Sequence, residues 1–224
     1  PHHQNEIAQT RSVTGKDFAR YWLHNGFVTV DGTKMAKSLG NFITVDTIIE
    51  KYSGNILRFF LLSTHYRNPI SLSEVSLDQA QTTLKRIQMF YSRVKKYLNN
   101  DENIIEDSKA DEETKKGAAE IEENALKFYT ALANDFNTAE ALSVLFVFMK
   151  SVEKNITGAN KKASESMKKI ILELMNDFNQ VFDVLDEQEL SGENDLGPIM
   201  DFIMEIRKEL KANKQYKLSD WIRA

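Results

Sequence analysis

The sequence predicts a mostly α-helical protein with a small β-containing part at its start. From Ile48 onward apolar residues recur at steps of three and four, and helix breakers are few, with 9 glycines and 3 prolines in 224 residues. Earlier in the chain, residues 27–30 have the β-branched and aromatic content of a short strand, and the turn signal Asp31-Gly32 follows. We therefore expect a strand, a turn and a polar loop, and then an antiparallel helical bundle.

Four stretches of helical periodicity make up the expected bundle. The second stretch stops at Asn134-Asp135-Phe136, and Asn137 with Glu140 three positions later is a helix-start signal, so a tight turn should join two helices there. The expected core stripes are Leu77, Ala80, Leu84, Ile87, Tyr91, Val94 and Leu98 on the first helix; Ala118, Ile121, Ala125, Phe128 and Leu132 on the second; Leu142, Leu145, Phe146, Met149 and Val152 on the third; and Met167, Ile170, Ile171, Leu174, Phe178 and Val181 on the fourth.

The segments between and after these helices are polar. Residues 99–116 are acidic with few apolar anchors and should form an exposed connection, and residues 187–197 have the composition of a linker. Beyond the linker, residues 199–210 predict another helix and Lys217 begins a further one.

Composition excludes several classes of protein. The formal net charge of -4 argues against binding nucleic acid by bulk electrostatics, so any RNA contact must come from local patches. Candidates are Lys161, Lys162, Lys168 and Lys169, although such runs usually form a solvated face. The chain has no cysteine, which excludes thiolate metal sites built from it alone, and no apolar run long enough for a bilayer. We expect a piece of a larger cytoplasmic protein.

One loop has the residues needed for phosphate chemistry. Lys34-Met35-Ala36-Lys37-Ser38-Leu39-Gly40-Asn41 places two lysines three positions apart, with a small residue between them and a glycine just beyond. Two ammonium groups on an approachable backbone suit a polyphosphate whose charge rises during attack at phosphorus. Lysine pairs are common in surface loops, however, and the segment does not match the P-loop pattern. Spacing alone leaves both interpretations open.

The wider sequence is similar to a known family. The lysine loop resembles the second signature loop of class I aminoacyl-tRNA synthetases, with Ala36 where serine is usual. Further segments resemble cysteinyl-tRNA synthetases and occur in that family's order, which a chance match of one loop would not explain. These segments are residues 1–9, beginning Pro1-His2-His3, and residues 21–26, 57–63, 65–67 and 135–138.

The resemblance implies an activity and roles for the loop. Family members join cysteine to ATP as cysteinyl adenylate, with magnesium, and pass the acyl group to tRNA(Cys) in protein biosynthesis. By resemblance, Lys37 holds the triphosphate in the transition state, Lys34 assists, and residues 34–38 (Lys34, Met35, Ala36, Lys37 and Ser38) bind ATP. Trp22 and His24 would line the adenylate pocket; the alternative for Trp22 is a simple core position.

The resemblance also implies a metal site. His2 and Glu6 are four apart and share a helix face, which in most proteins is only a helix-start pair. By resemblance they are half of a zinc site that binds the substrate thiolate, with two cysteines earlier in the parent chain as the other ligands. This chain alone should then bind zinc weakly or not at all. His3 is either a neighbour of that site or a solvent-facing residue.

The same resemblance divides the chain. Residues 1–42 would be the end of a Rossmann catalytic domain, 43–76 a stem-contact region, 77–190 the bundle, and 191–224 a linker with the start of an anticodon-binding domain. His65, Tyr66 and Arg67 would support the lysine loop, touch the acceptor stem or form a structural cluster. We expect a monomer that makes no adenylate by itself. The alternatives are a helical RNA-binding or scaffolding module without catalysis, and the related methionine enzyme.

Overall fold

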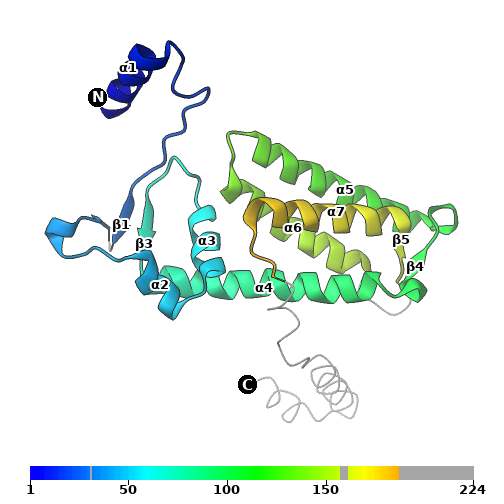
Figure 1. Ribbon diagram of the computed structural model, residues 1–224. Helices are drawn as coiled ribbons and strands as arrows, with labels where there is room; N and C mark the ends of the chain where they lie inside the picture. Colours follow the sequence, from blue (N-terminus) through cyan, green and yellow to red (C-terminus); the bar gives the residue numbers. More distant parts are fainter. Residues whose placement is uncertain (31, 157–160, 187–224) are drawn as a thin grey trace, which may run out of the picture. The chain divides into compact units, whose positions relative to one another are not determined.

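The computed structural model describes residues 1–30, 32–156 and 161–186, and it is mostly helical, as the sequence predicts. The expected linker at 187–197 and the helices expected after it lie outside the described residues. The described elements in chain order are α1 (His2–Thr14), β1 (Val28–Val30), β2 (Thr33–Lys34), the short 3-10 helix η1 (Lys37–Leu39), α2 (Val45–Lys51), α3 (Gly54–Leu62), β3 (Ile70–Leu72), α4 (Glu74–Leu98), η2 (Asp101–Asn103), β4 (Ile104–Ile105), η3 (Asp107–Lys109), α5 (Glu112–Ala133), α6 (Thr138–Ile156), β5 (Ala163–Ser164) and α7 (Glu165–Phe182) (Figure 1).

The strand expected at residues 27–30 is confirmed as β1, and it is the middle strand of a small mixed sheet. The sheet order is β2-β1-β3, with β2 antiparallel and β3 parallel to β1. Thr29 pairs with Lys34 on one side and with Ser71 on the other. The β1–β2 hairpin therefore places the start of the lysine loop next to the central strand.

Two short helices, α2 and α3, lie between β2 and β3 in the chain, and α3 packs against the bundle helices α4 and α7. Side-chain caps start both of them: Thr44 accepts from the Thr47 amide at the start of α2, and Ser53 accepts from the Ile56 amide at the start of α3. The buried face of α3 consists of Ile56, Leu57, Phe59 and Phe60. On its other side, the Arg58 Nε donates to the carbonyl of Phe182 at 2.6 Å, which ties α3 to the end of α7.

The long helix α4 starts at Ser73, where Ser73 and Ser76 form a reciprocal capping box. It packs against α3 in its first part and also contacts α7 (Figure 1). Six of the seven residues expected on its apolar stripe are buried, and the prediction for Tyr91 is wrong because the neighbouring Phe90 takes the core position. Tyr91 is half-buried, with Lys95 above its ring.

Helices α5 and α6 form a tightly packed antiparallel hairpin, and α7 packs on α5. Gly117 of α5 allows close approach to α6, because a Cβ there would lie 2.4 Å from the Asn155 Oδ1. The expected stripes are correct in most positions and shifted by one or two residues at four others. Ala131, Phe148 and Phe182 are buried where Leu132, Phe146 and Val181 were expected, and Gly117 is buried where Ala118 was expected. On α7, Ile170 is half-buried, and Met175, which was not expected, is buried.

The connection at residues 99–116 is more ordered than its composition predicts. It contains η2, η3 and β4, and β4 pairs in parallel with β5, so that Ile104 lies opposite Ala163. Tyr97 adds a hydrogen bond from its hydroxyl to the carbonyl of Lys161 at 2.8 Å. Most of the segment is exposed and it passes into α5 at Glu112, as expected, whereas its short 3-10 helices and the β4–β5 pairing were not predicted.

Within the described ranges, no helix combines the length and the low polarity that crossing a bilayer requires.

Candidate functional site

The lysine loop has a defined conformation that its own sequence produces. After β2 the Met35 amide still bonds to the carbonyl of Val28 at 3.2 Å, so the hairpin continues into the loop. Ala36 is extended, with φ -151° and ψ 140°, and η1 follows it. The loop ends at Gly40, whose φ of 68° is in the left-handed region that favours glycine.

Asn41 holds the two ends of this loop together. Its Oδ1 accepts from the Ala36 amide at 2.9 Å, and its Nδ2 donates to the carbonyl of Lys34 at 3.2 Å. Sequence reasoning included Asn41 in the motif but gave it no role. The available signal was the residue type, since asparagine side chains readily bond to nearby backbone groups.

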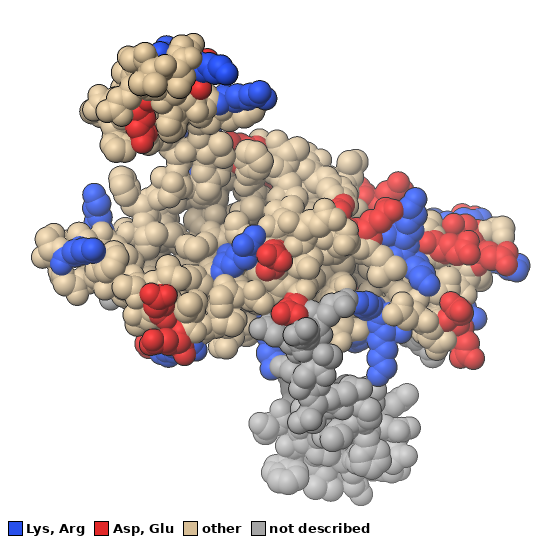
Figure 2. All heavy atoms as spheres, viewed as in Figure 1, with Lys and Arg blue, Asp and Glu red and all other residues tan. Residues whose placement is uncertain are grey.

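Both lysines of the loop are exposed, and each amine lies over an aromatic ring. The Lys34 Nζ is 4.9 Å from the centre of the Phe27 ring, and the Lys37 Nζ is 5.4 Å from that of Phe42. Among the described residues, neither amine forms an ion pair with a carboxylate. On the face shown in Figure 2, the β1–β2 hairpin carries blue side chains. Two cations oriented by rings, and not neutralised by any acid in the described part of the chain, can bind an anion.

The first helix places the proposed zinc ligands next to each other. The His2 Nε2 lies 3.5 Å from the Glu6 Oε1, one turn apart on α1, and the histidine is largely exposed. No cluster of three or more histidine, cysteine or acidic residues that would hold a metal occurs in the described ranges. The pair fits two positions of a four-coordinate zinc site, so any firm site needs donors from elsewhere.

The residues expected to line the adenylate pocket lie beside this pair. The ring of His3 is 5.1 Å from the rings of both Trp22 and His24, and Phe18 stacks on Trp22 at 5.5 Å. Trp22 is 37% exposed, which argues against a simple core role for it. The cluster borders an open hollow of about 520 Å³, lined by Pro1, His2, His3, Gln4, Ile7, Trp22 and His24. His2 of the metal-ligand pair thus shares one hollow with the pocket candidates Trp22 and His24, whereas neither Glu6 nor any residue of the lysine loop lines it.

A second cluster joins residues 65–67 to the turn between α5 and α6. The Tyr66 hydroxyl donates to the Asp135 Oδ1 at 2.8 Å, and the Arg67 Nε donates to the Asp135 Oδ2 at 2.6 Å. The His65 Nε2 lies 3.8 Å from the same carboxylate. The Arg67 and Tyr66 hydrogen bonds lower the pKa of Asp135 to about 2, and the carboxylate raises the pKa of the Tyr66 hydroxyl.

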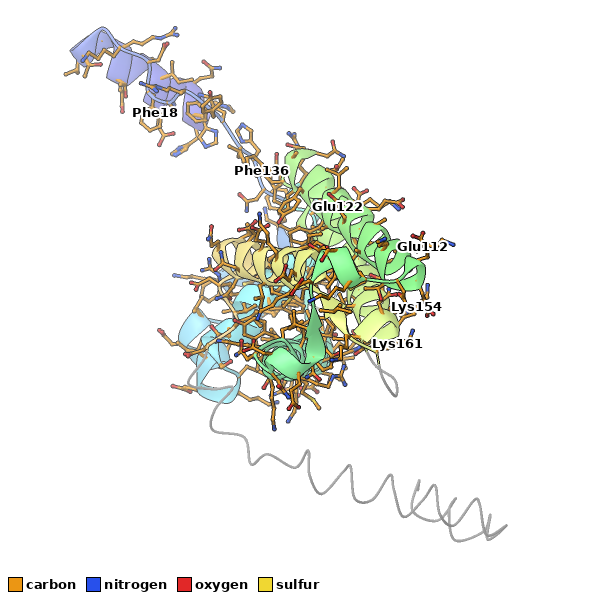
Figure 3. The ribbon with its side chains drawn as sticks, turned by 90° about the vertical axis from the view of Figure 1, so that its right-hand side faces the viewer. Phe18, Glu112, Glu122, Phe136, Lys154 and Lys161 are labelled. Atoms are coloured by element: carbon orange, nitrogen blue, oxygen red, sulfur yellow. The ribbon has the colours of Figure 1, made fainter. Side chains whose placement is uncertain are left out.

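The bundle lysines proposed for RNA contact are partly neutralised. Lys161 pairs with Glu113 at 3.2 Å, and Lys169 lies 3.8 Å from Glu173 on the same helix. Figure 3 shows Lys154 and Lys161 at the end of the bundle opposite Phe136, and Lys154 pairs with Glu120 at 2.8 Å. A face with alternating charges is a weak binder of a polyanion.

Comparison with known proteins agrees with the resemblance read from the sequence. Residues 1–82 match the family model of the class I (C) tRNA synthetase catalytic domain, and residues 127–186 match the DALR domain. A solved structure of an Agrobacterium radiobacter LeuRS in a ternary complex with tRNA and LeuAMS shares the fold, with a TM-score of 0.62 at 18% identity over 85% of this chain and 25% of that one.

Curated relatives align along the whole chain. It is 40% identical to the cysteine–tRNA ligase of Carboxydothermus hydrogenoformans, covering 46% of that protein, and 37% identical to that of Bacillus pumilus, covering 45%. The ligase of Thermococcus onnurineus is 36% identical, with 46% of its length covered. The chain thus spans a little under half the length of these relatives. On this evidence, the chain belongs to the cysteine–tRNA ligase family of class I aminoacyl-tRNA synthetases.

Proposed function

We propose that the full-length protein containing this chain activates cysteine with ATP and transfers the cysteinyl group to tRNA(Cys) in the cytoplasm. The proposal is supported above all by the lysine loop, which combines a family signature with two exposed amines that no described carboxylate neutralises. The relatives named as cysteine–tRNA ligases, which match this chain from end to end, provide independent support.

The proposed activation step is a displacement at phosphorus. A carboxylate oxygen of cysteine attacks the α-phosphorus of ATP, a new acyl–oxygen–phosphorus bond forms, and the bond to pyrophosphate breaks. Negative charge grows on the phosphate oxygens during this exchange. Lys37 and Lys34 would stabilise that charge, with Met35, Ala36 and Ser38 providing the backbone around the triphosphate, and magnesium accompanying ATP. The protein then acts mainly by positioning and electrostatics.

His2 and Glu6 are the residues of this chain that would hold zinc, together with two thiolates from the rest of the protein. When bound, such an ion would supply a soft Lewis acid for a thiolate, which discriminates sulfur from oxygen ligands of similar size. Trp22, His3 and His24 would form the wall of the adjoining pocket. Magnesium, ATP, cysteine and tRNA(Cys) are accordingly the proposed ligands, and a monomer is the proposed state.

Exposed apolar side chains support the proposal that another domain of the full-length protein packs against the first part of this chain. Large apolar side chains are exposed throughout the part of the chain that precedes α2, and contiguous exposed apolar surface usually marks an interface. These residues are Val13, Phe18, Tyr21, Trp22, Leu23, Phe27, Leu39 and Phe42. The first half of the catalytic domain would cover them, which supports the proposed limit of the catalytic part, 1–42. The further proposed limits, 43–76, 77–190 and 191–224, rest on the family resemblance.

Amino-acid-dependent ATP/pyrophosphate exchange by the full-length protein tests the proposal. Exchange should depend on cysteine and stay near background with serine or methionine. Exchange driven by methionine would instead favour the related methionine enzyme. No exchange with any amino acid, from a folded protein that still binds RNA, would favour the helical RNA-binding module without catalysis.

A further inference from the structure

The turn between α5 and α6 is fastened to a segment far away in the sequence. Asp135 receives hydrogen bonds from Tyr66, at a sequence separation of 69, and from both the Nε and the terminal NH2 of Arg67. Both carboxylate oxygens are therefore used by protein donors. Two parallel bonds from one guanidinium fix the orientation of a carboxylate as well as its position. We call these residues, His65 to Arg67 with Asp135, the Asp135 clamp.

The backbone on the bundle side of the clamp is strained. Asp135 and Phe136 both have left-handed backbones, with φ of 56° and 54°, although neither is glycine. The turn is nevertheless tightly bonded: the Thr138 amide bonds to the carbonyl of Phe136 at 2.8 Å, and Asn137 caps α6 through the Glu140 amide at 3.1 Å. Strain of this kind persists only where the surroundings hold it, and it concentrates at functional positions.

Residues 65–67 of the clamp are connected by backbone hydrogen bonds to the start of β1, the central strand of the sheet. The carbonyl of Tyr66 accepts from the Gly26 amide at 2.7 Å, and the carbonyl of Phe27 accepts from the Ile70 amide at 2.9 Å. A Cβ at Gly26 would lie 2.2 Å from the carbonyl oxygen of Asn68, so only glycine fits this approach. β1 begins two residues later and pairs with β2, which ends at Lys34.

We propose that Asp135 is a positioning residue for the lysine loop. In this role Asp135 acts through other residues and not on the substrate. It fixes residues 65–67 by hydrogen bonds, and the Tyr66 carbonyl in turn bonds to Gly26 just before β1. β1 pairs with β2 and thereby positions Lys34 and the loop that follows. The clamp would thereby fix the lysine loop relative to the α5–α6 hairpin. Its catalytic consequence rests on the proposed function, whereas its structural consequence does not.

The test compares Asp135→Asn with Asp177→Asn in the full-length protein. Asp177 is a matched control because it also accepts from a tyrosine hydroxyl, that of Tyr129 at 2.9 Å, but its partner lies within the bundle. In cysteine-dependent ATP/pyrophosphate exchange, Asp135→Asn should lower kcat about 10-fold to 100-fold, with the KM for cysteine within about 2-fold of the parent, since misplacement acts on the transition state. Asp177→Asn should match the parent in both.

Amide hydrogen exchange provides a measurement that does not need activity. Asp135→Asn should speed exchange at Gly26 and Met35, whose amides bond to Tyr66 and Val28, while amides in the middle of α4 keep the parent's rates. Tyr66→Phe, which removes one bond and keeps the Arg67 fork, should give a smaller effect in the same direction. It also replaces Asp135→Asn if that variant does not fold.

The outcomes separate the two proposals. Unchanged exchange at Gly26 and Met35, or a kcat per folded protein equal to that of Asp177→Asn, would overturn the clamp's positioning role. Faster amide exchange in a full-length protein that does not activate cysteine would support the clamp and contradict the proposed function.

Discussion

The side-chain amide of Asn41 bonds at once to the amide of Ala36 and to the carbonyl of Lys34. The last residue of the lysine loop thus holds the backbone of Lys34 and of Ala36, the residue before Lys37. These bonds within the loop's own sequence hold its backbone in one conformation, which would reduce the reorganisation needed when phosphate charge develops.

Replacing Asn41 by alanine should impair activation. Two hydrogen bonds to the loop are lost, each contributing about 1 kcal/mol, so the rate of ATP/pyrophosphate exchange should fall roughly 10-fold to 30-fold. Asn176→Ala, at an exposed position of α7, is the control and should leave the rate unchanged. A rate for Asn41→Ala equal to that of the control would show that the Asn41 bonds do not organise the loop for catalysis.

Ala36→Ser should have little effect on the same rate. The Ala36 amide, not its side chain, makes the bond to Asn41, and the residue is extended at the start of η1, where a serine is readily accommodated. We expect a change within about 3-fold, in line with small substitutions away from buried contacts. A gain of more than 10-fold on introducing the hydroxyl would mean that the usual serine takes part in the chemistry.

The stability contributed by Asp135 should depend on pH in a known direction. Its pKa in the folded protein is about 2, below the ordinary value of 3.8, so its contribution is fully present above pH 3.8 and is lost as the pH falls towards 2. Urea denaturation should show parent and Asp135→Asn differing most near pH 7, with the difference shrinking below pH 4 and being lost as the pH falls through 2. A difference that stays constant from pH 7 to pH 2 would mean that the ionised carboxylate is not what Tyr66 and Arg67 stabilise.

Zinc content tests the pair on α1 without reference to activity. In the full-length protein after dialysis, His2→Ala and Glu6→Ala should each lower the zinc measured per chain well below one, because removal of one ligand weakens a four-coordinate site. Lys37→Ala should retain the metal of the parent. Full zinc occupancy in the double variant of His2 and Glu6 would place the metal site elsewhere.

The sequence was enough to predict the long helices, the strand β1 and the capped start of α6. These depend on local periodicity and on short-range signals such as Asn137 followed by Glu140, which the structure contains as a hydrogen-bonded cap. The errors arose where two adjacent apolar residues compete for one core position. Phe90 and Tyr91 are one example: which of the two is buried depends on which helix packs opposite them.

Long-range contacts could not be predicted from local patterns. The pairing of β4 with β5 joins residues such as Ile104 and Ala163, and two-residue strands carry no periodicity of their own. The Asp135 clamp could not be predicted either, because Asp135 is more than sixty residues away from Tyr66 and Arg67 in the sequence. Family resemblance pointed to both segments but not to the fact that they bind each other. The hollow shared by His2, His3, Trp22 and His24 also required the folded chain to become visible.

The most direct measurement is the rate of cysteine-dependent ATP/pyrophosphate exchange by the full-length protein carrying Lys37→Ala, with Lys115→Ala as a surface-lysine control. Loss of a transition-state charge contact should lower the Lys37→Ala rate by a factor on the order of a hundred or more, while Lys115→Ala keeps the parent's rate. Equal rates for Lys37→Ala and the parent would contradict the assignment of the lysine loop to phosphate chemistry.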